Sequence, residues 1–262
     1  MPPAAATWLV SAAALVVALS CAGRAASAGE PAPRSGFYLM APETRAMQRD
    51  DAANPGTLWV AEGESLWRQA AGPEGRSCAS CHGDALTSMR GVAARYPAFD
   101  EATQRPVTLA GRVDLCRASR QRAPASPGSR ETLALAALLA RQSRGLPLAP
   151  PDDPRLAPWR SRGQALYMAR QGQLDLACAD CHDRHVGGRL GGSPIPPASP
   201  AGYPSYRLEW QDIGLLERRL RGCVAGVRAE AWPAGDAAYL ELELYLAERS
   251  KGAPMEAPSV RP

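Results

Sequence analysis

The sequence predicts a mainly α-helical protein in which one structural unit occurs twice. Two pentapeptides of the pattern C-x-x-C-H, Cys78–His82 and Cys178–His182, begin 100 residues apart. Further along the chain, the two halves stay matched at an offset of 107 residues, which pairs Cys116 with Cys223. A constant offset across separated blocks indicates an internal duplication rather than chance similarity. Because C-x-x-C-H attaches c-type haem, the predicted fold is mainly α, with two tandem class I-like cytochrome c domains.

The segments around the two motifs have the apolar spacing of amphipathic helices. Residues 57–69 and 159–171 lead into the motifs, while residues 131–144 and 236–249 end each repeat. The last two segments stop at a glycine that is followed two residues later by a proline, a pattern typical of helix C-termini. A helix before the haem motif and a helix at the end, packed around the porphyrin, is the cytochrome c arrangement.

The N-terminus has the features of an export signal. An apolar run from Thr7 to Leu19 precedes a small-residue cleavage site, Ala-Ser-Ala, at residues 26–28. The run is too short to span a membrane comfortably, and no later segment is apolar enough, so we expect no membrane span. Haem c is attached outside the cytoplasmic membrane, which predicts a periplasmic protein. Lipid attachment at Cys21 is an alternative.

These features divide the chain into six parts. We expect a signal peptide (1–28), an N-terminal extension (29–56), a first cytochrome c domain (57–146), a proline-rich linker (147–158), a second cytochrome c domain (159–252) and a tail (253–262). The extension is polar, and its structure stays open. The tail is rich in proline, and we expect it to be frayed.

The composition agrees with a protein that is built around cofactors. Aromatic residues make up 6% of the 262 residues, and only two of them are Phe, so side chains alone would form a thin core. Two covalently bound haem c groups would fill that core. The net charge is +4, and a single Lys leaves Arg as the main cation. This arginine bias weakens any argument from an arginine cluster, and we expect no nucleic-acid partner.

The internal repeat limits which residues can be the distal ligands of the two haem irons. Electron-carrying cytochromes c use Met or His there, but Met89 has no counterpart in the second half, and His185 follows His182 too closely to reach the opposite haem face. We interpret His185 as a surface residue or as one that contacts a haem propionate. Cys116 and Cys223 are repeated and can bind iron. A disulfide between these two cysteines is the alternative interpretation.

The expected haem ligands follow from this choice. Cys78 and Cys81 would form the thioethers of the first haem, with His82 and Cys116 as axial ligands of its iron. Cys178 and Cys181 would form those of the second haem, with His182 and Cys223 as axial ligands. Thiolate lowers the reduction potential of a haem and suits chemistry on sulfur better than simple electron relay.

Three segments of the second half resemble the SoxA family, the catalytic subunits of the SoxAX cytochromes of bacterial thiosulfate oxidation. They are GQLDLA at residues 172–177, YRLEWQ at 206–211 and RRLRGCVAGVRAE at 218–230. The similarity extends over residues 35–56 and 116–145, and the two C-x-x-C-H motifs match the dihaem type of this family.

The resemblance implies an L-cysteine S-thiosulfotransferase. Such a protein forms a heterodimer with the monohaem cytochrome SoxX and joins thiosulfate oxidatively to a cysteine of the carrier SoxYZ. The catalytic cysteine of the family, which can carry a persulfide, corresponds to Cys223. Its substrate-binding arginine corresponds to Arg219, and the ligand of its N-terminal haem to Cys116. The second domain would then be the catalytic one.

The residue types suit this chemistry. Guanidinium groups bind oxyanions with paired donors, and Arg219 would lie one turn before Cys223 if that segment is helical. Arg112 occupies the corresponding place in the first repeat, so Arg219 could instead neutralise a haem propionate. The second repeat also contains seven extra residues within 187–202. We expect this insertion to open the second haem pocket to substrate while the first pocket is closed.

Two other functions remain compatible with the sequence. A thiosulfate dehydrogenase also has two c-type haems, one of them bound by thiolate, but forms tetrathionate without a carrier protein. A dihaem electron-transfer cytochrome would use the same attachment motifs without acting on thiosulfate.

Overall fold

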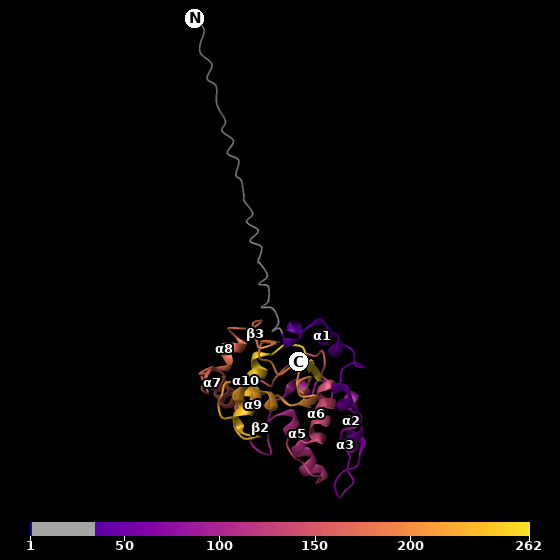
Figure 1. The fold of residues 1–262 in the computed structure, drawn as a ribbon. Helices are drawn as coiled ribbons and strands as arrows, with labels where there is room; N and C mark the ends of the chain where they lie inside the picture. Colours follow the sequence, from indigo (N-terminus) through magenta and orange to yellow (C-terminus); the bar gives the residue numbers. More distant parts are fainter. Residues whose placement is uncertain (2–34) are drawn as a thin grey trace. The chain divides into compact units, whose positions relative to one another are not determined.

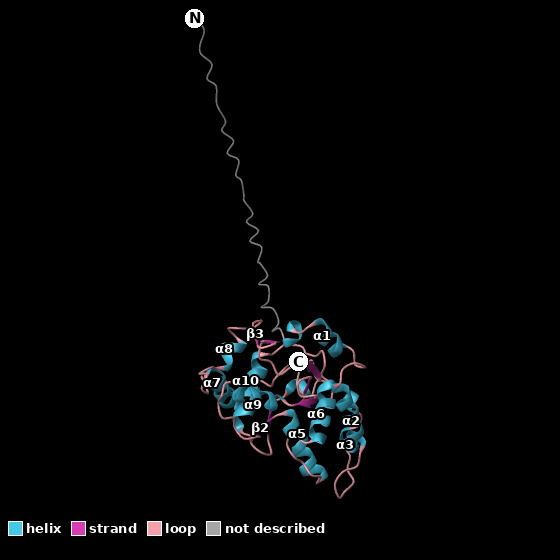
Figure 2. Cartoon of the chain, viewed as in Figure 1, coloured by secondary structure: helices cyan, strands magenta, loops and turns pink. Residues whose placement is uncertain are grey.

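The computed structural model describes Met1 and residues 35–262. The predicted signal peptide therefore lies outside the described residues. Helices dominate, and the strands are short and few (Figure 2). Within the described residues, no helix is long and apolar enough to cross a membrane.

The first repeat begins with a long helix and ends with another. Its elements are α2 (Gly56–Arg68), α3 (Cys78–His82), α4 (Ala85–Ser88), η2 (Ala93–Arg95), β1 (Ala98–Asp100), β2 (Arg105–Val107), α5 (Leu109–Cys116), η3 (Arg117–Gln121) and α6 (Arg130–Arg141). The first C-x-x-C-H motif forms α3, and β1 and β2 form an antiparallel hairpin.

The second repeat keeps the order of a long helix, a motif helix, a hairpin, the helix with the third cysteine and a final helix. Its elements are η4 (Pro154–Leu156), α7 (Ala157–Met168), α8 (Cys178–His182), β3 (Arg189–Leu190), β4 (Ser193–Pro194), β5 (Ser205–Arg207), β6 (Asp212–Gly214), α9 (Leu216–Gly226) and α10 (Ala237–Arg249). The hairpin of β5 and β6 corresponds to that of β1 and β2, because both hairpins pair residues at the same offset of 107. The hairpin of β3 and β4 belongs to the insertion and has no counterpart.

The four predicted helices form where the sequence places them, with ends that differ by three residues or fewer. Local capping explains several of these ends. The side chain of Ser129 accepts a hydrogen bond from the Thr132 amide before α6, and Asp236 accepts one from the Ala238 amide before α10. Such caps satisfy amide groups that have no partner within the helix.

In each repeat the first helix crosses the last helix at a glycine. A Cβ atom on Gly63 of α2 would lie 2.3 Å from the Ala134 carbonyl oxygen of α6. A Cβ atom on Gly163 of α7 would lie 1.9 Å from the Glu241 carbonyl oxygen of α10. These two glycines are 100 residues apart, so the duplication preserves the close helix crossing that brackets each motif.

The two repeats pack against each other through small side chains. The helices α2, α5 and α6 group together, and α7, α9 and α10 form a second group (Figure 1). A shared core cluster joins them and contains Ala93, Ala94, Ala140 and Leu148 together with Ala201, Ala247, Met255 and Ala257. The segment between the repeats takes part, since Leu148 is 3% and Leu156 is 1% exposed.

The prediction that the C-terminal tail is frayed is wrong. Ser259–Arg261 forms β7, which pairs in parallel with β5 and completes a three-stranded sheet of order β6-β5-β7. Val260 is 0% exposed. Proline content suggested an unpaired segment, but β5 offers a free edge to which this strand can bind.

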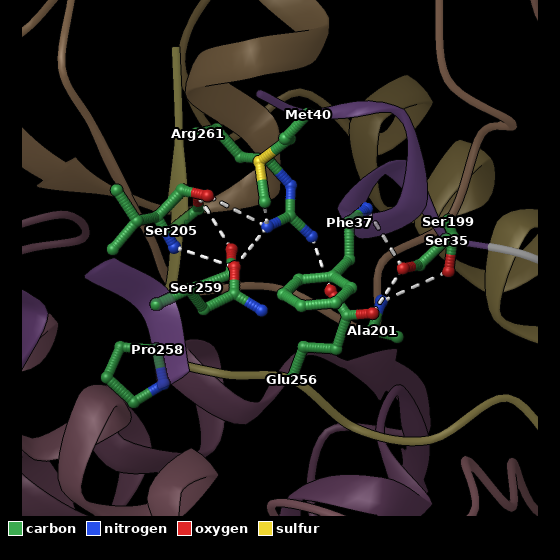
Figure 3. Close-up of polar contacts among 12 residues, drawn as sticks. Ser35, Phe37, Met40, Ser199, Ala201, Ser205, Glu256, Pro258, Ser259 and Arg261 are labelled. Carbon is green, nitrogen blue, oxygen red and sulfur yellow. Dashed lines mark hydrogen bonds and ion pairs between the residues drawn. The ribbon is translucent and has the colours of Figure 1, made fainter. Parts of the chain in front are cut away.

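The N-terminal extension folds onto this strand. It contains η1 (Gly36–Leu39) and α1 (Pro42–Arg49). The side-chain oxygen of Gln48 accepts a hydrogen bond from the Val260 amide at 3.0 Å. Arg261 binds Glu256, and Glu256 also contacts the Ser35 hydroxyl (Figure 3). The first and last described segments are thereby tied to the hairpin of the second repeat.

Candidate functional site

The second C-x-x-C-H motif is held firmly by its surroundings. The Asp180 carboxylate accepts a hydrogen bond from the Ala177 amide at 2.8 Å and caps α8. The ring nitrogen Nδ1 of His182 lies 2.7 Å from the carbonyl oxygen of Pro196. A carbonyl oxygen only accepts, so Nδ1 donates to Pro196, and Nε2 is the ring nitrogen left for another partner. Iron-binding histidines are oriented by this kind of hydrogen bond.

The thiol of Cys223 faces the imidazole of His182, and the two side chains form a hydrogen bond. They come from different helices, α9 and α8. The segment around Cys223 is helical, because α9 covers Leu216–Gly226, and the condition for placing Arg219 one turn earlier is met. The structure therefore brings together three residues that the sequence selected.

The surroundings of Cys223 favour its thiolate form. Burial alone would raise the pKa of this thiol. The pKa is nevertheless lowered, because the hydrogen bond with His182 and the positive charges of Arg219, His182 and Arg207 outweigh burial. A lowered pKa increases the thiolate fraction, which is the nucleophilic and metal-binding form of cysteine.

The first repeat places Cys116 at the end of α5, close to the thiols of its own motif. Burial and the nearby Cys81 raise the pKa of Cys116, although Arg120 and Arg112 act in the opposite direction. Burial and Cys116 likewise raise the pKa of Cys78. The structure thus places Cys116 near enough to Cys78 and Cys81 for these thiols to interact electrostatically.

The six described cysteines are all unpaired. Cys116 and Cys223 therefore form no disulfide with each other, and both thiols remain available as ligands. Two buried polar atoms beside the first motif also have no partner among the described residues, Arg117 Nε and Gln121 Oε1. The amide nitrogen of Gln121 lies 3.8 Å from Cys78 Sγ.

These observations fit a covalently bound haem in each repeat. Each motif supplies two thiols for thioether bonds and a histidine, and a third thiol lies nearby in both. In the second repeat, Nε2 of His182 and the thiol of Cys223 face each other, and together they are the donor pair expected for iron. In the first repeat, the buried atoms of Arg117 and Gln121 lie near Cys78 without a partner among the described residues, which agrees with a bound group beside this motif.

The other two residues considered as ligands lie elsewhere. His185 is exposed, and its Nδ1 lies 2.5 Å from the Asp180 carbonyl oxygen, which agrees with its interpretation as a surface residue. Met89 is 9% exposed and packs in the apolar core of the first repeat.

The insertion in the second repeat lies in an unexpected place. It forms the β3–β4 hairpin and supplies Pro196, whose carbonyl binds the ring of His182. The insertion therefore supports the histidine, not the side of Cys223 where substrate was expected to enter. Cys81 and His82 are exposed, whereas Cys181 and His182 are half-buried. The extra residues thus cover the second histidine, and access of substrate to the second haem pocket, with the first one closed, stays a prediction.

Two residues near Cys223 escaped the sequence analysis. Tyr203 and Arg207 both interact electrostatically with this site. The repeat alignment contains a signal for Arg207, since its counterpart in the first repeat is Asp100, a residue of opposite charge. Pro196 carries no such signal, because it lies in the insertion.

Comparisons with known proteins agree with this geometry. A sequence model of the SoxA/TsdA cytochrome c domain matches residues 62–148 and 162–255. The L-cysteine S-thiosulfotransferase subunit SoxA of Pseudaminobacter salicylatoxidans is 36% identical over 229 residues, which are 87% of this chain and 80% of that protein. The corresponding subunit of Rhodovulum sulfidophilum is 35% identical over 233 residues, with the same coverage.

A solved structure shows the same fold. The crystal structure of SoxXA from P. pantotrophus matches with a TM-score of 0.84 and 33% sequence identity, over 88% of this chain and 87% of that chain. The fold and the attachment motifs define a c-type cytochrome that is mainly α-helical and binds haem c covalently. Among such cytochromes, this chain belongs to the SoxA family.

Proposed function

We propose that this chain is the catalytic SoxA subunit of a periplasmic L-cysteine S-thiosulfotransferase. The observation that carries the proposal is the arrangement of Cys223 against His182 with Arg219 one helical turn away. Relatives that are 36% and 35% identical carry the same name, L-cysteine S-thiosulfotransferase subunit SoxA. The substrates are thiosulfate and a cysteine of the carrier protein SoxYZ.

Two haem c groups are part of this proposal. Cys78 and Cys81 would hold the first haem, with His82 and Cys116 as the ligands offered to its iron; Cys178 and Cys181 would hold the second haem, with His182 and Cys223 as the ligands offered to its iron. When bound, haem c would supply one-electron chemistry, by which the electrons from sulfur would reach SoxX or another cytochrome c. The two cytochrome c domains span residues 57–146 and 159–252, and the second domain is the catalytic one.

The reaction removes two electrons from sulfur. The thiolate of Cys223 bonds to the outer sulfur of thiosulfate, giving a cysteine thiosulfonate and two electrons. The carrier thiol then loses its proton and attacks the same outer sulfur, which releases the Cys223 thiolate. In sum, a thiol and thiosulfate form the thiosulfonate of the carrier, one proton and two electrons. Cys223 can also carry a persulfide, which is a stronger nucleophile.

Each neighbour of Cys223 has a role in these steps. Arg219 binds the sulfonate oxygens through paired guanidinium donors. The positive charges around Cys223 keep its sulfur in the thiolate form. Pro196 holds the ring of His182 in one orientation, so that this histidine would offer a defined ligand to a haem iron.

The partner in this proposal is a monohaem SoxX cytochrome that forms a heterodimer with this chain. The structural relative is a SoxXA complex. The carrier SoxYZ would bind transiently, because it must leave with its thiosulfonate group.

The decisive experiment uses the haem-loaded heterodimer, oxidised cytochrome c, thiosulfate and carrier protein. The expected result is reduction of cytochrome c together with a carrier whose mass increases by one thiosulfonate group. The Cys223→Ser variant should lose both signals. Intact mass spectrometry of the carrier and the absorbance of reduced cytochrome c measure them.

Two results would replace this proposal. Tetrathionate formation without any carrier would identify a thiosulfate dehydrogenase. Normal electron transfer between redox partners, with no reduction by thiosulfate, would identify an electron-transfer cytochrome. Mass analysis of the Cys223 peptide adds a separate observation, because an extra sulfur atom there marks a persulfide.

A further inference from the structure

The two repeats differ in charge beside two equivalent arginines. These are Arg112, four residues before Cys116, and Arg219, four residues before Cys223. In the first repeat, Arg112 forms an ion pair with Asp100 at 2.7 Å, and Asp100 is 4% exposed. The hairpins align at an offset of 107 residues, which places Arg207 at the position of Asp100. Arg207 is 8% exposed. A buried carboxylate in one repeat is therefore replaced by a buried guanidinium in the other.

Arg207 is fixed in position by the sheet. It lies on β5, the central strand between β6 and β7. Its Nε donates to Glu209 Oε1 at 2.7 Å, and its guanidinium carbon lies 5.2 Å from the centre of the Trp210 ring. Among the described residues, this bond to Glu209 is the only hydrogen bond of the Arg207 side chain. The two terminal nitrogens of its guanidinium group are free to donate hydrogen bonds to a ligand.

One carboxylate oxygen marks the place where such a ligand would lie. Glu209 Oε1 is 2.7 Å from Arg207 Nε and 3.8 Å from a terminal nitrogen of Arg219. The two guanidinium groups therefore converge on a single anionic oxygen. The Glu209 side chain is 49% exposed, so it can move into solvent. The residue at the corresponding position of the first repeat is Ala102, which has no charge.

We propose that Arg207 and Arg219 together bind the sulfonate oxygens of thiosulfate beside Cys223, and that the carboxylate of Glu209 occupies this position until the substrate displaces it. The inference rests on the proposed function and extends it to a second arginine. The site takes dianionic, tetrahedral oxyanions.

The charges explain why a dianion would be selected. Two guanidinium groups carry two positive charges, and Glu209 balances one of them. A monoanion that displaces this carboxylate leaves the charge of the pair unchanged, whereas thiosulfate neutralises it. Arginine forks also match the oxygen atoms of a sulfonate group geometrically. In the first repeat, Asp100 already neutralises Arg112, so that position has no comparable affinity for an anion.

The test compares Arg207→Ala with Arg218→Ala in the haem-loaded heterodimer. Arg218 is the neighbour of Arg219 on α9, but it pairs with Asp212 at 2.9 Å and lies over the Trp210 ring. Two measurements are needed: steady-state kinetics with thiosulfate, and binding of sulfate, an unreactive dianion, by calorimetry. Arg207→Ala should raise the KM for thiosulfate about tenfold or more, with kcat nearly unchanged. Sulfate affinity should fall by a similar factor.

Three variants extend the comparison. Arg218→Ala should match the wild type in both measurements. Arg207→Lys should recover part of the lost affinity, because it restores the charge without the fork. Glu209→Gln should strengthen sulfate binding, because the competing carboxylate is removed. If Arg207→Ala does not fold, Arg207→Gln is measured against the same criteria.

The proposal fails if Arg207→Ala and Arg218→Ala have the same KM and the same sulfate affinity. It also fails if Arg207→Ala changes only the haem content or the low-spin iron signal in electron paramagnetic resonance, because Arg207 would then pair with a haem propionate. Weaker sulfate binding in Glu209→Gln would overturn the role of Glu209. A failure of the proposed function differs from all of these, since the wild-type protein itself would not be reduced by thiosulfate.

Discussion

Each repeat places a thiol beside a C-x-x-C-H motif, yet the charges around the two thiols differ. Burial and Cys81 raise the pKa of Cys116 in the first repeat. Burial would do the same to Cys223, but His182, Arg219 and Arg207 lower its pKa. The helices that carry the two cysteines are equivalent, so the difference arises from their neighbours. A duplicated scaffold can thus keep its ligand geometry in both copies while only one copy becomes reactive.

The largest expected effect separates the two cysteines. Cys223→Ser should lower thiosulfate-dependent reduction of cytochrome c by about a thousandfold or more, because it removes the proposed nucleophile. Cys116→Ser should retain most of this activity and change mainly the spectrum and potential of the first haem. Turnover assays and redox titration of both haems measure these effects. Equal loss of turnover in both variants would show that the first repeat takes part in catalysis.

The second difference between the repeats is the additional strand β7, which only the second hairpin has. Deletion of residues 259–262 removes the fully buried Val260. The free energy of unfolding should fall by at least about 2 kcal/mol, the contribution of burying a valine side chain. The KM for thiosulfate should also rise, because β5 carries Arg207.

Denaturant unfolding and steady-state kinetics measure the two effects of this deletion. Removal of Pro262 alone, beyond the end of β7, should leave both quantities unchanged. A loss of stability without any change in KM would mean that β7 supports the fold but not the position of Arg207.

The third comparison concerns the helix crossings. A methyl group on Gly163 would meet the Glu241 carbonyl oxygen at 1.9 Å, and one on Gly63 would meet the Ala134 carbonyl oxygen at 2.3 Å. Each Gly→Ala change should destabilise the protein by about 1–3 kcal/mol, because the helices must separate. Gly163→Ala should be the more severe of the two.

Thermal unfolding of the haem-loaded protein measures the ranking of these glycine variants. The control is Gly226→Ala in α9, where an added methyl group meets no atom of the described residues within 4 Å. Its stability should be unchanged or slightly raised, since alanine favours helix. If Gly163→Ala is as stable as this control, the two helices can separate without cost, and the crossings do not constrain the haem motifs.

The sequence was sufficient to predict the repeat, the helices and the position of Cys223, because these depend on local spacing and on a constant offset. Arg219 and Cys223 lie on one helix, so their separation of one turn follows from residue number alone. Long-range pairings were not predictable in the same way. The strand β7 binds β5 across 54 residues of chain, from Ser205 to Ser259, and proline content gave the opposite expectation.

The insertion illustrates a related limit. Its length and position were evident, but whether it would lie on the side of His182 or of Cys223 depends on the path of the backbone. The structure places the Pro196 carbonyl on His182. Arg207 lies within the segment YRLEWQ at residues 206–211. Its difference from the first repeat becomes evident only when the repeat alignment is combined with the ion pair between Asp100 and Arg112.

The smallest expected effect concerns Asp100, which occupies in the first repeat the position that Arg207 has in the second. Hydrogen bonds from Thr103 and the pairing with Arg112 lower the pKa of this carboxyl to about 2, from an ordinary value of 3.8. A carboxyl with a depressed pKa stabilises the folded protein above the ordinary pKa, and this contribution is lost as pH falls through the folded-state pKa. Asp100→Asn should therefore be less stable than the wild type at neutral pH, and the difference should shrink below about pH 4 and disappear near pH 2.

Urea unfolding across this pH range measures the difference, with Asp212→Asn as the control in the second hairpin. Asp212 pairs with the exposed Arg218, and its side chain is 39% exposed, so solvent screens its interaction. A difference between Asp100→Asn and the wild type that does not depend on pH would mean that the Asp100 side chain acts through packing rather than charge. Neutralisation of Arg112 by Asp100 would then not explain why the first repeat has an aspartate at the position where the second repeat has Arg207.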